Sequence, residues 1–411
     1  MSVQKISNAI LGVGVDDTTI DLFESQYPVP TGVSYNSYVI LDEKVAILDT
    51  VDDRATDAWL ANLTEALGDR MPEYLVVSHM EPDHGANIAR LAAKYPDMKV
   101  VGNAKTFVYM EQFFGPDAVA KERRVVVKDG ESLSLGSHTL TFVFAPMVHW
   151  PEVMVSYESS EKVLFSADGF GRFGAVAKFD EKADWASEAR RYYLNIVGKY
   201  GPQVQALLKK AAALDIQTIC PLHGPVLQGD LTPYLYLYNT WSSYQPETRG
   251  VFIAYASIYG NTKTAALLLA EELKSRGVTV EIADLSRTDL AQAVAKAFQY
   301  SQMVCAAPSY DGGVFPVMAD FLHHLKSKSY QNRTVALIEN GSWAPYAKTQ
   351  RRPHHDRPVG GDESHPPAVG HRHRARRLKG RRPHRAGRTG RRAGAVRSRP
   401  WLYIQTQISS P

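Results

Sequence analysis

Seven side chains of the kinds that bind metal ions follow four apolar runs in the first 230 residues. Four of them fall within the six-residue segment His79-Met80-Glu81-Pro82-Asp83-His84, between a strand-like run and a helix-like run. The complete set is His79, Glu81, Asp83, His84, His149, Asp168 and His223. Because it holds three carboxylates and no thiolate, the set suits redox iron or manganese better than structural zinc.

The spacing predicts a site for two metal ions with room for a small substrate. Alternate residues of an extended loop point the same way, so residues 79, 81 and 83 can face one direction while residue 84 faces across. This predicts His79, Glu81 and His149 around one metal. The second metal receives Asp83, His84 and His223, and Asp168 bridges the two.

Alternating strands, helices and turn clusters must position these ligands. They run to about residue 230, and residues 231–249 read as an aromatic connector. A second unit then opens on the buried-strand signature Val251-Phe-Ile-Ala-Tyr-Ala and continues as strand, loop and helix, the mark of a doubly wound parallel sheet. Its helices are predicted near 263–275, 289–299 and 315–327, and its strands near 251–256, 278–283, 302–306 and 333–338.

The loop after the first strand of this second unit could hold a phosphate. It reads Ser257-Ile258-Tyr259-Gly260-Asn261-Thr262 and leads into a helix. A phosphate at a helix N-terminus gains backbone N–H donors and the helix dipole, and Ser257, Asn261 and Thr262 add side-chain donors. There is no P-loop lysine pattern, which argues against a nucleotide triphosphatase. By itself the loop could also be an ordinary strand-to-helix turn.

Two further loops follow the third and fourth strands of the same sheet. Ligands of doubly wound sheets bind at the carboxyl ends of the strands, so these loops would flank a planar ring with backbone amides and aromatic side chains. They comprise Pro308, Ser309, Tyr310, Asp311, Gly312 and Gly313, and then Asn340, Gly341, Ser342 and Trp343. The three loops together are similar to those of flavodoxin, which implies flavin mononucleotide (FMN) as cofactor; Tyr310 and Trp343 could instead be core or rim aromatics.

The metal cluster resembles that of the metallo-β-lactamase fold. Hydrolases of that fold carry His-x-His-x-Asp-His, whereas Glu81 replaces the second histidine here. Together with Val148-His149-Trp150-Pro151-Glu152 and Phe165-Ser-Ala-Asp168-Gly-Phe-Gly, the pattern resembles the flavodiiron proteins over residues 1–346. A dinuclear zinc hydrolase is the alternative.

The resemblance implies an architecture and a reaction. Residues 1–248 would form a metallo-β-lactamase-like αββα domain with two non-haem irons, and residues 250–346 an incomplete flavodoxin-like domain with FMN. The implied enzyme reduces dioxygen to water or nitric oxide to nitrous oxide. A separate rubredoxin-like carrier supplies electrons, and the chains assemble as a head-to-tail homodimer or a homotetramer. The sequence leaves the choice of gas open.

The character of the chain changes at about residue 347. Residues 351–411 carry 15 Arg and one Lys against three acidic residues, a balance of +13 that leaves −9 for the first 350. A shifted reading frame explains this Arg-, Pro- and Gly-rich tail; the alternative is a disordered tail that binds nucleic acid or acidic lipid. Residues 347–411 are expected to be disordered, and loss of the last flavodoxin-like helix would uncover an apolar sheet face.

Composition limits the remaining classes. Two distant cysteines, Cys220 and Cys305, predict no disulfide framework and a reducing, cytoplasmic setting. No apolar stretch approaches the roughly 18 residues that span a bilayer, and the N-terminus lacks a signal-peptide core. We therefore expect no membrane partner and no specific nucleic-acid partner.

Overall fold

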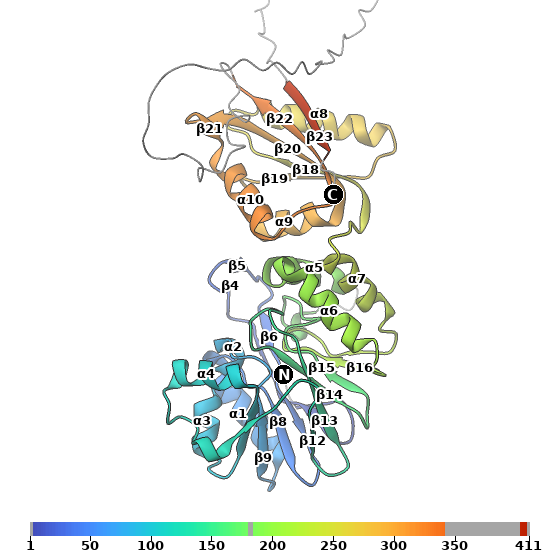
Figure 1. Cartoon of the computed structure of the whole chain (residues 1–411). Coiled ribbons are helices and arrows are strands. Elements are labelled where there is room, and N and C mark those ends of the chain that lie inside the picture. The colour runs from blue at the N-terminus through green and yellow to red at the C-terminus, as the bar shows by residue number, and fades with distance from the viewer. Residues whose placement is uncertain (1–2, 180–183, 342–402, 409–411) are drawn as a thin grey trace, which may run out of the picture.

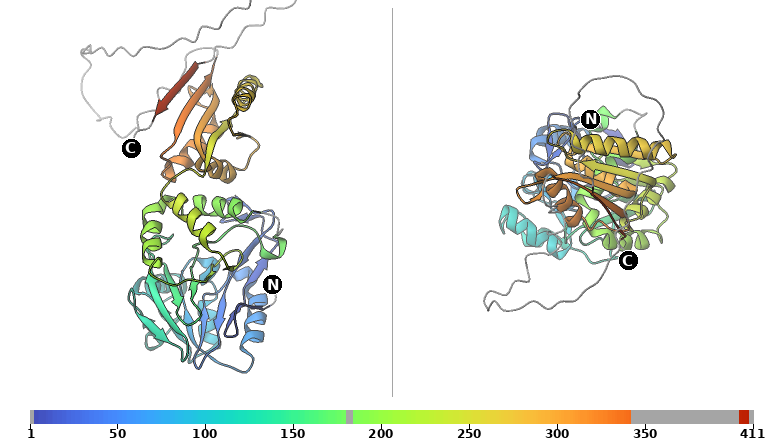
Figure 2. Two further views of the ribbon diagram at one scale, coloured as in Figure 1. Left: turned by 90° about the vertical axis from the view of Figure 1, so that its right-hand side faces the viewer. Right: turned by 90° about the horizontal axis from the view of Figure 1, so that it is seen from above.

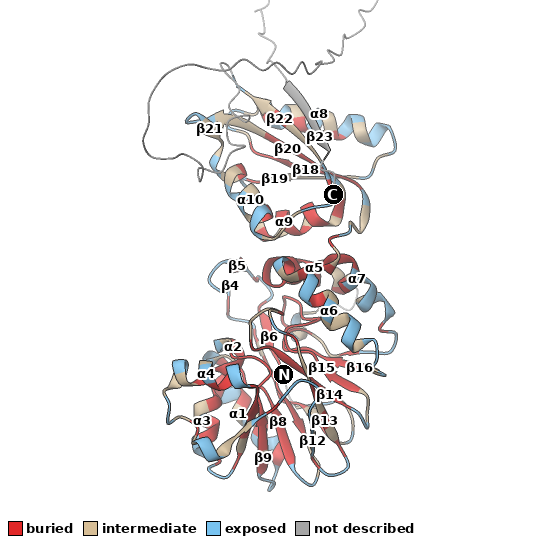
Figure 3. Ribbon diagram, in the orientation of Figure 1, coloured by how far each residue is buried: buried red, intermediate tan, exposed pale blue. Residues whose placement is uncertain are grey.

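The computed structural model describes residues 3–179, 184–341 and 403–408. These residues form two domains stacked one above the other, each built on β-sheets covered by helices (Figures 1 and 2). The buried residues concentrate in the sheets and on the inner faces of the helices (Figure 3). Among the described residues, no helix is both long and apolar enough to cross a membrane.

The first domain is a sandwich of two sheets. One sheet has the order β1-β2-β7-β8-β9-β10-β11 and the other β12-β13-β14-β15-β16-β17. The strands are β1 (Gln4–Lys5), β2 (Ile10–Gly12), β7 (Tyr38–Ile40), β8 (Val45–Leu48), β9 (Pro72–Val76), β10 (Lys99–Gly102), β11 (Arg124–Val126), β12 (Ser132–Ser134), β13 (Thr139–Phe144), β14 (Met154–Glu158), β15 (Val163–Phe165), β16 (Thr218–Cys220) and β17 (Leu227–Gln228).

Alternation along the strands builds the core between the sheets. Ile40 and Leu48 from one sheet join Phe142 and Phe165 from the other in a single buried apolar cluster, because successive strand residues point to opposite faces. The outer faces pack on helices: α1 (Thr56–Leu67), α3 (Ile88–Lys94) and α4 (Ala104–Phe114) on one side, and α5 (Trp185–Ile196), α6 (Gly201–Ala211) and α7 (Thr232–Ser242) on the other (Figure 1). This is the αββα arrangement that the sequence predicts.

Short elements complete the domain. Two small hairpin-like pairs join β3 (Val15–Asp17) to β6 (Val33–Tyr35) and β4 (Leu22–Phe23) to β5 (Tyr27–Pro28). One helical turn, α2 (Pro82–Gly85), follows β9. Short 3-10 turns cover Asp53–Ala55, Lys121–Arg123, Val176–Lys178 and Gly198–Tyr200.

The aromatic connector is a helix of the first domain. Residues 232–242 form α7, and Tyr238 and Trp241 are buried in the main core. Tyr238 stacks on Phe170 with ring centroids 4.0 Å apart. The aromatic residues of this segment therefore cover the second sheet, and only residues 243–247 connect the domains.

The second domain has the strand order β19-β18-β20-β22-β23. Its strands are β18 (Thr248–Tyr255), β19 (Val280–Asp284), β20 (Tyr300–Tyr310), β21 (Gly313–Val314), β22 (Thr334–Asn340) and β23 (Tyr403–Ile408). β18, β19, β20 and β22 are mutually parallel, and β18 begins two residues before the predicted domain boundary. The first four strands thus follow the order of a flavodoxin-like sheet.

Helices lie on both faces of this sheet. α8 (Asn261–Ser275) packs on the face that carries Ile253 and Tyr255. α9 (Leu290–Gln299) and α10 (Pro316–Ser327) pack on the opposite face, against Phe252 and Ala254. The three helices match the sequence predictions to within a few residues.

The edge of the sheet differs from the expectation for the tail. Tyr403–Ile408 forms β23, which pairs antiparallel with β22, although no element was predicted after residue 347. The rest of the predicted disordered region, residues 347–402 and 409–411, lies outside the described residues. Val335, Ala336 and Leu337 of β22 are half-buried.

Polar contacts between α5 and the second domain hold the two domains together. Asn195 donates from Nδ2 to the carbonyl of Ala291 at 3.2 Å, and Gln292 Nε2 donates to Glu188 Oε1 at 3.1 Å. Lys328 also donates to the carbonyl of Asn195. Through α5, whose next turn carries Tyr192 beside the candidate site, the second domain is tied to the metal-binding part of the first.

Candidate metal centre

The predicted ligands all come from loops at one edge of the sandwich. His79 follows β9, Asp168 follows β15 and His223 follows β16, while His149 lies between β13 and β14. Glu81 directly precedes α2, and Asp83 and His84 lie within that helical turn. The extended-loop prediction therefore holds only to Glu81, because the chain turns helical at Pro82 and redirects Asp83.

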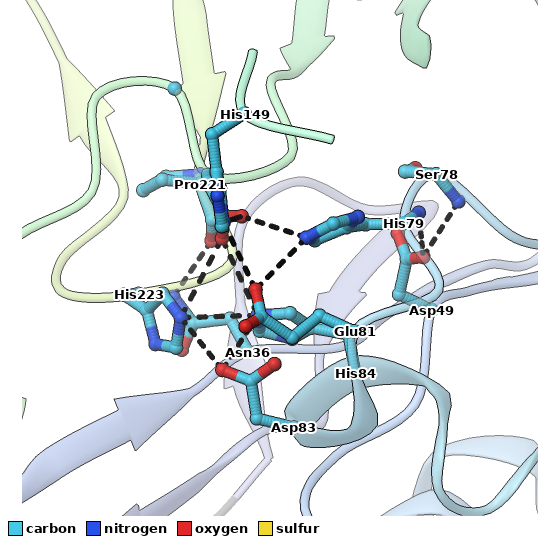
Figure 4. Close-up of polar contacts among 12 residues, drawn as sticks. Asn36, Asp49, Ser78, His79, Glu81, Asp83, His84, His149, Pro221 and His223 are labelled. Atoms are coloured by element: carbon cyan, nitrogen blue, oxygen red, sulfur yellow. Dashed lines mark hydrogen bonds and ion pairs between the residues drawn. The ribbon is translucent and has the colours of Figure 1, made fainter. Parts of the chain in front are cut away.

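The distances between possible ligand atoms divide the seven side chains into the two groups that the sequence predicts. In the first group, Glu81 Oε2 lies 2.9 Å from His149 Nε2 and 3.1 Å from His79 Nε2. Possible ligand atoms of these three residues and Asp168 lie within 4.8 Å of one another. The side chains of His79, Glu81 and His149 point toward one another in Figure 4.

The second group contains Asp83, His84 and His223. Nε2 of His84 and Nε2 of His223 face each other at 3.0 Å, and Asp83 Oδ2 lies 3.3 Å from each. Two imidazole nitrogens and a carboxylate oxygen that point at one position form a ligand set typical of a divalent metal.

Asp168 faces both groups with different oxygens. Its Oδ2 lies 3.3 Å from Nε2 of His79 and of His149. Its Oδ1 lies 3.4 Å from Nε2 of His84 and 3.6 Å from Nε2 of His223. One buried carboxylate thus stands between the two groups, the placement expected of a bridging ligand.

The charge of the centre fits cations. Both carboxylate oxygens of Asp83 and of Asp168 are buried and accept no hydrogen bond from the described residues. Buried carboxylates without such partners are costly unless a cation compensates them. A cation in each group would compensate the charge of these carboxylates, so the residues present fit a dinuclear metal site.

The acid–base properties of the side chains point the same way. Burial raises the pKa of the Glu81 carboxyl, but hydrogen bonds from His149 and His79 outweigh it and leave that pKa at about 2. Burial lowers the pKa of His149, but Asp168 and Glu81 outweigh it and raise that pKa to about 9. The carboxylates therefore favour positive charge at this edge of the sandwich. In the absence of a metal ion, a proton on His149 supplies that charge.

A second layer of groups orients the ligands, and sequence reasoning missed it. Glu152 Oε1 accepts from Nδ1 of His79 at 2.8 Å and from the backbone N–H of Met80 at 2.9 Å. The carbonyl of Ser34 lies 2.8 Å from Nδ1 of His223. Both contacts leave Nε2 free for a metal, as carboxylate–histidine–metal relays do. The signal was present, because Glu152 lies three residues after His149 in the quoted motif.

Aromatic side chains enclose most of the centre. The rings of Phe23, Tyr35 and Tyr192 lie 5.4, 5.9 and 5.4 Å from that of His223, and Trp150 lies 5.2 Å from His79. The side chains of His79, His84, Asp168 and His223 are at most 1% exposed. Only Glu81, Asp83 and His149 retain exposure, between 11% and 17%, which marks one open side.

The three candidate flavin loops lie at the carboxyl ends of the parallel strands β18, β20 and β22. Gly260 has φ +86° before the first residue of α8, a conformation that favours glycine. Its N–H donates to Ser257 Oγ at 3.1 Å, and Asn340 Nδ2 donates to Thr262 Oγ1 at 3.2 Å. The last contact joins the first loop to the third, as one shared ligand site requires.

The second predicted loop forms a hairpin. Ser309 and Tyr310 end β20, and Ser309 pairs with Val314 of β21 across a turn at Asp311 and Gly312. Tyr259 is 92% exposed and Tyr310 45% exposed, so both aromatic rings are open to solvent. Of the third loop, Asn340 and Gly341 are described, whereas Ser342 and Trp343 lie outside the described residues.

Comparisons with known proteins agree with both domains. Residues 33–224 match the family model described as ODP family beta lactamase. The chain is 29% identical to a rubredoxin-oxygen oxidoreductase from Megalodesulfovibrio gigas over 84% of this chain and 87% of the relative. It is 28% identical to a nitric oxide reductase from Moorella thermoacetica, over 82% of this chain and 86% of the relative.

Solved structures give the same result. The rubredoxin oxygen:oxidoreductase from Desulfovibrio gigas superposes with a TM-score of 0.77 at 29% identity, over 84% of this chain and 86% of that chain. The flavodiiron protein from Giardia intestinalis superposes with a TM-score of 0.79 at 24% identity, over 84% and 85%. The second likeness concerns the fold alone.

Proposed function

The chain belongs to the flavodiiron proteins, and from this premise we propose that it reduces a small gas at a pair of irons. The gas is dioxygen, reduced to water, or nitric oxide, reduced to nitrous oxide; relatives are named for each activity. The observation that carries the proposal is the placement of Asp168, whose two oxygens face the two histidine groups separately. A ligand shared in this way holds two metals close enough to act on one substrate together.

The protein side chains hold and shield the metals in this proposal. His79, Glu81 and His149 would hold one iron, and Asp83, His84 and His223 would hold the other. Glu152 and the Ser34 carbonyl keep two of the imidazoles in the tautomer that presents Nε2. The aromatic side chains that enclose the centre would limit the access of water to the two metals.

The electrons come from a second cofactor. When bound, FMN and the irons supply redox chemistry that amino-acid side chains lack. We propose that the Ser257–Thr262 loop holds the FMN phosphate at the N-terminus of α8. The Ser309–Gly313 hairpin and the loop from Asn340 to Trp343 would flank the ring. The contact between Asn340 and Thr262 supports a single site.

A dinuclear zinc hydrolase is the less favoured function. Glu81 is hydrogen-bonded to His79 and His149 and so contributes to the first group directly. A third carboxylate in place of a histidine favours harder, higher-valent iron. The second domain, with its joined loops, has no role in simple hydrolysis.

Metal and turnover measurements test the proposal together. The full chain, purified without oxygen, should contain two irons and, if the flavin site is complete, one FMN. Steady-state turnover with each gas, driven by chemically reduced rubredoxin, should show reduction of at least one. Two zinc ions per chain and no turnover with either gas would establish the hydrolase alternative.

We further propose a rubredoxin-like electron donor and a head-to-tail homodimer, alone or within a homotetramer. Helices α9 and α10 lie between the sheet of the second domain and the first domain (Figures 1 and 2). A second chain could bring its flavin loops to the open side of the metal centre.

Mixing two inactive variants tests this assembly. Asp168→Ala should disable the metals, and Ser257→Asp should repel the FMN phosphate. If each reaction uses the metals of one chain and the flavin of the other, refolding the two variants together should restore activity, because one of the two sites is intact. No restoration, with mixed dimers demonstrated by tagging, would exclude the head-to-tail arrangement.

A further inference from the structure

A small apolar cavity lies in the first domain between the second sheet and helices α6 and α7. Its volume is about 40 Å³, and its wall includes Val155, Leu164, Val204, Leu207 and Ile219. A site for one molecule the size of water needs about 10–15 Å³. The cavity therefore has room for a diatomic molecule but not for an organic metabolite.

The inner end of the cavity touches the loops that carry the metal ligands. Val148, which directly precedes His149, forms part of the wall. So do Gly169 and Phe170, which directly follow Asp168. The cavity thus adjoins the loops that carry the Asp168 and His149 ligands.

The polar groups near the cavity are turned away from it. Ser166 Oγ donates to the carbonyl of Gly169 at 2.6 Å, and the hydroxyl oxygen of Tyr238 accepts from the N–H of Phe170. Within the described residues, the wall presents no polar atom to the cavity. A water molecule needs two to four polar partners, so such a cavity stays dry and can hold an apolar guest such as xenon.

The outer end of the cavity adjoins a depression on the surface. A second hollow of about 430 Å³, more open to solvent, is lined by Gln217, Gly229 and Thr232. It shares Ile216, Leu231 and Leu235 with the inner cavity. Leu235 is 40% exposed, so the boundary that the two hollows share reaches solvent.

We propose that this cavity is a binding site for an uncharged diatomic gas, which it takes from the surface depression and delivers to the metal centre. The inference rests on the proposed function for the identity of the gas. Dioxygen and nitric oxide partition from water into apolar space, whereas water and ions gain nothing there. The site raises the local concentration of gas beside the Asp168 and His149 loops.

Helix α6 offers a matched pair of variants. Ala211 lines the cavity, and Ala206 on the same helix is exposed to solvent. Ala211→Phe should fill the cavity, and Ala206→Phe adds the same side chain outside it. Ala211→Leu is a smaller change, for use if the phenylalanine variant does not fold.

Xenon is the probe for gas binding, and turnover is the probe for delivery. Crystals of the full chain under xenon pressure should show one xenon atom between α6 and α7 in the wild type and in Ala206→Phe, and none in Ala211→Phe. Ala211→Phe should raise the KM for the gas at least threefold, with iron content and kcat unchanged. Ala206→Phe should leave the KM unchanged.

The two measurements separate this proposal from the proposed function. An empty cavity in the wild type under xenon, or an unchanged KM in a folded Ala211 variant that has lost xenon, would overturn the proposal. If the iron-loaded wild type reduces neither gas, the proposed function fails, but xenon occupancy still decides whether the cavity binds gas.

Discussion

Replacing Glu152 by glutamine should weaken one metal position and spare the other. Glu152 contacts only the first group, through His79 Nδ1 at 2.8 Å and the Met80 N–H at 2.9 Å. Loss of a carboxylate behind a histidine ligand costs about 10- to 100-fold in metal affinity, or about 1.4–2.8 kcal/mol. In Glu152→Gln the new amide nitrogen would be buried where the carboxylate has an unpaired oxygen, which adds to the loss.

The chain offers a matched control in Glu158, the last residue of the strand β14 that begins two residues after Glu152. Glu158 is fully buried and accepts from the backbone N–H groups of Ser160 and Glu161 at 2.9 and 2.7 Å, away from the metal ligands. Glu158→Gln makes the same chemical change at similar burial. Any general effect of burying an amide should therefore appear in both variants.

Iron content after dialysis against graded chelator concentrations measures the effect. Glu152→Gln should lose one iron per chain at a chelator concentration about 10- to 100-fold below that needed for the wild type, while the second iron is retained longer. Glu158→Gln should follow the wild type. Equal loss of both irons, or the same curve for both variants, would refute the reasoning that Glu152 acts through His79.

Three further predictions concern the bridge, pH and the tail. Asp168→Ala should abolish magnetic coupling between the irons, and a coupled pair in Mössbauer spectra of this variant would show that Asp168 is not the bridge. Burial lowers the pKa of His138, but hydrogen bonds to Asp42 and Glu161 outweigh it and raise that pKa. The resulting stabilisation of the folded state, about 1 kcal/mol, is present below about pH 6.5 and is lost as pH rises through the raised pKa of His138. In thermal melts, His138→Gln should therefore remove the fall in stability over this pH range. A pH profile of stability that is unchanged in His138→Gln would argue against this role of His138. Deleting residues 348–411 should abolish salt-dependent nucleic-acid binding without lowering iron content, and binding that survives the deletion would place it elsewhere.

Local sequence patterns were sufficient for much of the second domain. The helices and strands from residue 251 to 340 follow from apolar runs bounded by turn residues, since each element of a doubly wound sheet is short and locally coded. The same reasoning failed at residues 232–242, where the aromatic residues of α7 are buried by contact with Phe170 and the second sheet. The local sequence of such a helix does not indicate which distant residues it packs against.

The types and order of the candidate metal ligands could be predicted from the sequence, because His79 to His84 are close along the chain and the chemistry of carboxylate and imidazole does not depend on the fold. Only the tertiary structure decided how Asp168 divides its two oxygens between the groups and which carboxylate supports His79. Glu152 and His79 are 73 residues apart, and they meet because the two sheets pack face to face. Contacts of that separation depend on the packing of the whole domain, as does the apolar cavity beside the loops of the metal centre.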